Sequence, residues 1–129
     1  MLVKTLYHIY LRGLIMAKEH LPAWDLSGLY RNIDDKSIGS ATRSVEGKLS
    51  KFVSKYRGRV ARTASNPVLL ARAFEEYEAI LTGTAKPVIY AQLLFAESSA
   101  DPRKGAFLQR MKSWHTKIEK GLLFFELEL

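Results

Sequence analysis

The stretch Asp34-Asp-Lys-Ser-Ile-Gly-Ser-Ala-Thr-Arg-Ser-Val-Glu-Gly-Lys-Leu-Ser-Lys-Phe-Val-Ser-Lys-Tyr-Arg-Gly58 decides the fold class of this 129-residue chain. Its apolar side chains recur every three or four residues, which places them on one face of an α-helix. These side chains are Ile38, Ala41, Val45, Leu49, Phe52 and Tyr56. Asp34 or Asp35 can cap the start of the helix, and Gly58 can end it. We therefore predict a long amphipathic helix with one buried stripe.

The rest of the chain shows the same helical spacing and no useful length of strand-like alternation. Asn66-Pro67 and Asp101-Pro102 each place a capping residue before a proline, which is typical of a helix start. We expect Gly83 to end the helix that begins at Pro67, and Pro87 to open another that runs to about Ser98. Because the connections are short, neighbouring helices should pack antiparallel. The predicted fold is an all-α, antiparallel helical bundle built from hairpins.

The chain divides into three parts on its composition. Residues 1–15 are apolar with interspersed Lys4 and Arg12, too short and too charged for a membrane span, and Met16 is a plausible true start. We interpret 1–15 as a non-native or mis-started extension, 16–33 as an irregular anchored arm, and 34–129 as the helical domain. The chain contains no cysteine, which favours a reducing, cytoplasmic setting. Because the apolar start is too short and too charged to span a bilayer, we expect no membrane association.

The net charge of +7 is concentrated between Lys36 and Arg62, where eight basic residues face only one acidic residue, Glu46. Such a stripe can meet phosphates or an acidic partner, although a solvated helix face is the plainer interpretation. The residues that we expect to bind polyanions are Lys48, Lys51, Lys55, Arg57 and Arg59.

Residues for catalysis or metal binding do not form a known pattern. A helical zinc site needs two histidines four residues apart with a glutamate beside the first. The histidines are His8, His20 and His115, and no two have this spacing. Paired carboxylates such as Asp34-Asp35 fit helix capping better than acid–base chemistry. We predict no catalytic residue, no metal ligand and no cofactor in this chain.

The C-terminal stretch is unusually apolar for a chain end. It carries Leu122, Leu123, Phe124, Phe125, Leu127 and Leu129 with no helix-stop signal after them. We expect the helical domain to be truncated here. These side chains should then dock on a missing part of the protein or drive self-association.

Several short segments, in order, resemble the N-terminal region of the oligoendopeptidase F group, the M3 family of zinc metallopeptidases. The segments are Pro22-Ala-Trp-Asp-Leu-Ser-Gly-Leu-Tyr30, Phe52-Val-Ser-Lys-Tyr-Arg-Gly-Arg-Val60, Phe74-Glu-Glu-Tyr-Glu-Ala-Ile80, Leu93-Leu-Phe-Ala with Asp101-Pro-x-x-Gly105 and Leu108-Gln-Arg110, and Leu123-Phe-Phe-Glu-Leu-Glu-Leu129. The resemblance covers about residues 20–129. It implies that the chain is an all-helical lobe of an enzyme that cleaves short peptides. In that enzyme, zinc is bound by residues far downstream, which this chain lacks.

Three functions follow from these observations. The leading one is an N-terminal fragment of an oligoendopeptidase F-like enzyme, inactive without its zinc-bearing half. The alternative is a free-standing basic helical module that binds nucleic acid or an acidic protein partner. The third is a two-part enzyme, in which a separate chain supplies the zinc half and docks on the apolar C-terminus.

Overall fold

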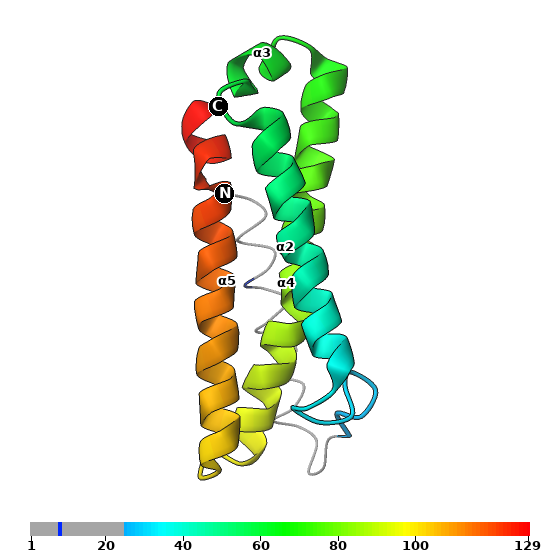
Figure 1. The fold of residues 1–129 in the computed structure, drawn as a ribbon, viewed down its shortest axis with the longest axis vertical. Coiled ribbons are helices and arrows are strands. Elements are labelled where there is room, and N and C mark those ends of the chain that lie inside the picture. Colours follow the sequence, from blue (N-terminus) through cyan, green and yellow to red (C-terminus); the bar gives the residue numbers. More distant parts are fainter. Residues whose placement is uncertain (1–7, 9–24) are drawn as a thin grey trace.

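The computed structural model describes residue 8 and residues 25–129, so the predicted 1–15 extension and the first part of the 16–33 arm lie almost wholly outside the described residues. The described residues form α2 (Lys36–Tyr56), α3 (Val60–Ala64), α4 (Pro67–Glu97) and α5 (Pro102–Glu128), with no strand among them. Figure 1 shows α2, α4 and α5 side by side, with α4 running opposite to the other two. The predicted all-α class is confirmed, and successive long helices form antiparallel hairpins.

The three long helices begin where the sequence predicts. The side chain of Asp35 accepts a hydrogen bond from the amide of Ser37 at 2.9 Å, and Asp101 accepts one from the amide of Arg103 at 2.9 Å. Asn66 accepts from the amide of Val68 at 3.0 Å. Each cap satisfies an amide that has no partner inside its helix, which fixes the start of the helix locally.

The predicted break at Gly83 and restart at Pro87 are wrong, because α4 is one helix from Pro67 to Glu97. Pro87 has no N–H to donate to the Gly83 carbonyl, four residues earlier. The helix continues because residues on both sides of this point, including Ile80 and Val88, are buried against the other helices. Packing of the amphipathic face outweighs the local breaking signals.

A single hydrophobic core runs along the three long helices, and Phe125 is central to one end of it. The Phe125 side chain is fully buried, with its ring centroid 5.2 Å from those of Phe52 and Tyr77 and 5.4 Å from that of Phe74. At the other end, Tyr30 packs edge-on against Tyr90 at 5.0 Å and connects the described part of the arm to α4. Rings at these distances add stabilisation beyond the burial of their area.

The turn after α2 contains the short helix α3, which the sequence analysis did not anticipate. Gly58 has a φ of +76°, a left-handed conformation that glycine adopts without steric cost. The predicted end of the helix near Gly58 is confirmed. Val60, the first residue of α3, is fully buried, so α3 closes one end of the bundle.

By length and composition alone, α4 could cross a membrane, but 56% of its apolar window is buried inside the described structure. A core helix has the same composition, and α4 packs against both α2 and α5. Its apolarity is explained by its central place in the bundle.

Candidate functional site

Several interhelical polar contacts and a cavity lie at one end of the bundle. Figure 1 shows that α2 ends, α3 lies, α4 begins and α5 ends at this end of the molecule. The described contacts agree, because α3 contacts both α4 and α5. We call this surface the α3 end.

A polar network joins α2 to α4 at the α3 end. Glu76 accepts hydrogen bonds from the Lys55 ammonium at 2.7 Å and from the Tyr56 hydroxyl at 3.1 Å. The hydrogen bond to Glu76 raises the pKa of Lys55 above its ordinary value. Burial is the main cause of the raised pKa of Tyr56. Glu76 therefore neutralises Lys55, and both groups are engaged within the chain.

Two further carboxylates hold the last turn of α5 in place. Glu126 accepts a hydrogen bond from the Tyr77 hydroxyl at 2.6 Å, and Glu128 accepts one from the Gly58 amide at 2.8 Å. Burial, and then the bond to Glu126, raise the pKa of the Tyr77 phenol, which stays protonated as a donor. These carboxylates act as structural acceptors.

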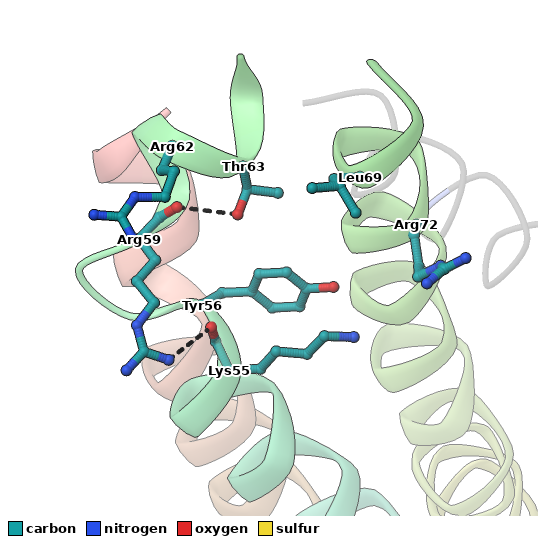
Figure 2. A pocket seen from close by; sticks show the side chains of 7 residues that line it. All are labelled: Lys55, Tyr56, Arg59, Arg62, Thr63, Leu69 and Arg72. Atoms are coloured by element: carbon teal, nitrogen blue, oxygen red, sulfur yellow. Dashed lines mark hydrogen bonds between the residues drawn. The ribbon is translucent and has the colours of Figure 1, made fainter. Parts of the chain in front are cut away.

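A cavity of about 220 Å³ lies where α2, α3 and α4 meet, lined by Lys55, Tyr56, Arg59, Arg62, Thr63, Leu69 and Arg72. Figure 2 shows these side chains around it. The lining contains four cationic side chains and no carboxylate, with Tyr56 and Leu69 supplying apolar surface. We call it the cationic cavity.

The four cationic side chains of the cationic cavity differ in their existing hydrogen-bond and ion-pair partners. Lys55 is paired with Glu76, and the Arg59 guanidinium donates to the carbonyls of Ser54 and Lys55 at 3.3 and 3.4 Å. Among the described residues, the guanidinium groups of Arg62 and Arg72 have no hydrogen-bond or ion-pair partner. Arg62 and Arg72 are therefore the cations most available to a ligand.

The structure places the predicted polyanion-binding residues along the exposed side of α2 and the turn that follows it. These residues, all exposed, are Lys48, Lys51, Lys55, Arg57 and Arg59. Only Lys55 and Arg59 line the cationic cavity. Sequence reasoning missed the other cations: Arg62 belongs to the same basic stretch and could have been included, whereas Arg72 comes from α4 and reaches the site only through the fold.

The predicted docking set at the C-terminus needs correction. Leu122 and Phe125 are buried in the core of this chain, and Phe124 is partly buried against it. They are covered because the last turns of α5 pack beside α2 and α4, so the expectation that the whole terminus lacks packing partners is wrong. Leu123, Leu127 and Leu129 are 47%, 77% and 53% exposed and stay candidates for docking.

Val68 and Leu69, in the first turn of α4, are the other exposed large hydrophobic side chains among the described residues. The start of α4 and the end of α5 both lie at the α3 end (Figure 1). Exposed apolar side chains thus gather at one end of the bundle, next to the cationic cavity.

No group of three or more metal-ligating side chains occurs among residue 8 and residues 25–129. His115 lies on α5 with its Nε2 atom 3.9 Å from a carboxylate oxygen of Glu119, one helical turn away. His20 lies outside the described residues. Asp35, one of the candidate paired carboxylates, is the cap of α2.

In comparisons with known proteins, no protein-family model, no curated protein and no solved structure matches this chain.

Proposed function

We propose that this chain is the N-terminal helical lobe of an oligoendopeptidase F-like zinc metallopeptidase, a lobe that carries no active site of its own. The observation that supports this most is the convergence of three of the family-like segments at the α3 end. Gly58 of the second segment bonds to Glu128 of the last, and Tyr77 of the third bonds to Glu126 of the last. Segments that are far apart in sequence thus form one structural unit.

The remaining family-like segments also have structural roles. Leu26 and Tyr30 of the first segment are buried against the bundle. Asp101 caps α5, and Leu108 is buried in the core. Residues that resemble the family therefore shape and stabilise the helices, which fits a supporting lobe of a larger enzyme.

In this proposal the complementary part of the enzyme binds zinc and the peptide substrate, and this chain supplies a helical wall. The exposed side chains at the α3 end, including Leu127 and Val68, suit contact with that part. The same surface would serve a two-part enzyme whose zinc half is a separate chain. Neither zinc nor a peptide would be held by this chain alone.

The experiment that tests this proposal is genetic and then biochemical. We expect the DNA downstream of codon 129, or a neighbouring gene, to encode a His-Glu-x-x-His helix. Co-expression of that product with this chain should give a complex that cleaves short peptides in a chelator-sensitive manner. Two results would contradict the proposal. One is a genome that contains no such coding sequence. The other is a zinc-bearing product that does not bind this chain and is active without it.

A second candidate function is binding of an acidic partner, with nucleic acid the less favoured target, and the observation that favours it is the row of exposed cations on α2. Lys48 and Lys51 lie there without a hydrogen-bond or ion-pair partner among the described residues. Exposed cations alone give weak, sequence-independent binding whose affinity falls steeply as salt rises, because it depends on counterion release. Tight, salt-resistant binding to one nucleic-acid sequence in a fluorescence-anisotropy titration would favour this function over the peptidase lobe.

A further inference from the structure

We propose that the cationic cavity is a binding site for a small organic anion: a carboxylate or phosphate group attached to a short apolar chain. This proposal does not rest on the peptidase lobe and concerns a site that the family resemblance does not assign. It follows from the placement of unpartnered guanidinium groups beside an apolar surface in one cavity.

The cationic half of the site comes from two helices. Figure 2 shows Arg62 on α3 and Arg72 on α4 on opposite sides of the cavity, with their guanidinium groups turned outward from it. Both side chains are exposed and lack a partner among the described residues, so either can turn toward a bound anion. A guanidinium group matches the geometry of a carboxylate or phosphate with two parallel hydrogen bonds. Lys55 is paired with Glu76, whereas Arg59 is held only by neutral backbone carbonyls and so raises the local positive potential.

The apolar half of the site is equally well defined. Leu69 is 44% exposed at the start of α4, and the Tyr56 ring forms part of the same wall. The Thr63 hydroxyl donates to the Arg59 carbonyl at 3.0 Å, and Figure 2 shows the methyl group of Thr63 on the side of Leu69. A ligand with an apolar chain would cover Leu69 and remove this area from water.

The size of the cavity limits the ligand. Its volume of about 220 Å³ is below the roughly 300–1,000 Å³ of sites for drug-sized molecules. A short acyl or alkyl chain with one anionic group fits such a volume. A polynucleotide would instead lie along the whole basic stretch, including Lys48 and Lys51, which are outside the lining. The cavity therefore favours a small anion over nucleic acid.

The test uses the purified chain and four probes in calorimetric and amide chemical-shift titrations. Hexanoate and hexyl phosphate carry both halves of the proposed ligand, 1-hexanol carries only the apolar half, and inorganic phosphate only the charge. We expect both hexyl anions to bind, with shifts at Thr63 and Leu69, and the tighter of the two identifies the preferred head group. Inorganic phosphate and hexanol should each bind at least about tenfold more weakly.

Matched variants locate the charge. Arg62→Gln and Arg72→Gln should each weaken binding of the hexyl anions by about tenfold. Arg57→Gln removes the same charge from an exposed arginine outside the lining, and should change the affinity by less than about twofold at moderate salt. These positions are exposed, so helix content by circular dichroism should be unchanged.

Three results would overturn the proposal. The first is no binding of either hexyl anion at millimolar concentration by the folded wild-type chain. The second is equal binding of inorganic phosphate and hexanoate, which would leave no role for the apolar wall. The third is an equal loss of affinity in the Arg57 and Arg62 variants, which would assign the binding to the whole basic stretch and support polyanion binding instead.

Discussion

Gly83 of α4 lies directly against Val45 of α2, so closely that a Cβ atom added to Gly83 would lie 2.7 Å from the Val45 Cγ2 atom. Real Cβ atoms do not approach other carbon atoms to that distance. Val45 is buried and β-branched, so its side chain has little freedom to move away. The glycine allows close approach of α2 and α4, and this explains why it occurs inside a continuous helix.

We predict that Gly83→Ala destabilises the chain by about 1 kcal/mol. Alanine gains about 1 kcal/mol of helix propensity over glycine, but the overpacked contact with Val45 costs about 1–3 kcal/mol. Chemical denaturation followed by circular dichroism measures the difference. In a Val45→Ala background the cost of Gly83→Ala should disappear, which a double-mutant cycle would detect as coupling.

Gly47 provides the matched control for this prediction. It lies inside α2, with nothing within 4 Å of an added Cβ atom. Gly47→Ala should therefore stabilise the chain by about 0.5–1 kcal/mol. If Gly83→Ala stabilised the chain as much as Gly47→Ala, the close approach of α2 and α4 at Val45 would be incorrect.

The C-terminal apolar residues should divide into two classes on substitution. Phe125→Ala should cost about 3–5 kcal/mol, because it empties a site that is fully enclosed by other rings. Leu127→Ser should change stability by less than about 0.5 kcal/mol, because Leu127 is 77% exposed. Denaturation midpoints measure the first effect.

The exposed leucines at the C-terminus form the second class, and their effect is measured as self-association. Combined substitution of Leu123, Leu127 and Leu129 by serine should lower self-association in sedimentation experiments, because it removes an exposed apolar patch. Helix content should be retained. Loss of the folded state on these substitutions would mean that the exposed leucines also belong to the core.

Local signals in the sequence predicted the helix starts well, and they failed where the outcome depends on a distant residue. Asp35, Asn66 and Asp101 each cap a helix through amides two or three residues away, so the signal and its partner lie together in the sequence. The role of Gly83 depends on Val45, thirty-eight positions earlier, and no local rule contains that information.

In the candidate site, too, the sequence predicted the residues that lie close together in the chain and missed those that only the fold brings near. The basic stretch on α2 is visible in the sequence, and it led to Lys55 and Arg59. Arg72 joins them only because α4 folds back antiparallel to α2. The burial of Phe125 was likewise missed, because an apolar run at a chain end can be assigned to a core only when its partners, such as Phe52, are known.

Asp35 gives the chain a specific pH dependence. Hydrogen bonds from the amide of Arg31, and then from Ser37, lower the pKa of Asp35 from 3.8 to about 2. A carboxyl group with a depressed folded-state pKa stabilises the protein above its unfolded-state pKa, and this contribution is lost as the pH falls toward 2. The difference in stability between the wild type and Asp35→Asn should therefore be constant above about pH 5 and shrink between about pH 4 and 2.

Ser37→Ala supplies a check on the cause. The Ser37 hydroxyl donates to Asp35 at 2.7 Å, so its removal should raise the pKa of Asp35 and move the acid transition to higher pH. Carboxyl resonances followed by NMR across the titration report this directly. An Asp35 resonance that titrates at the ordinary aspartate value in the wild type would contradict the capping geometry.

The last prediction concerns the bond between Glu128 and the Gly58 amide, which ties the end of α5 to the turn before α3. The 2.8 Å distance and the carboxylate acceptor make this a charge-assisted hydrogen bond, and Gly58 is otherwise exposed. Glu128→Ala should speed hydrogen exchange of the Gly58 amide several-fold, while amides in the middle of α4 change little. Glu126→Gln is the control, because it alters the contact with Tyr77 and leaves the Gly58 bond in place.

If the Gly58 amide exchanged at the same rate in the wild type and in Glu128→Ala, the end of α5 would not be anchored to the turn. Leu127 and Leu129 would then lie on a frayed end of α5 and could not present a fixed docking surface to a partner.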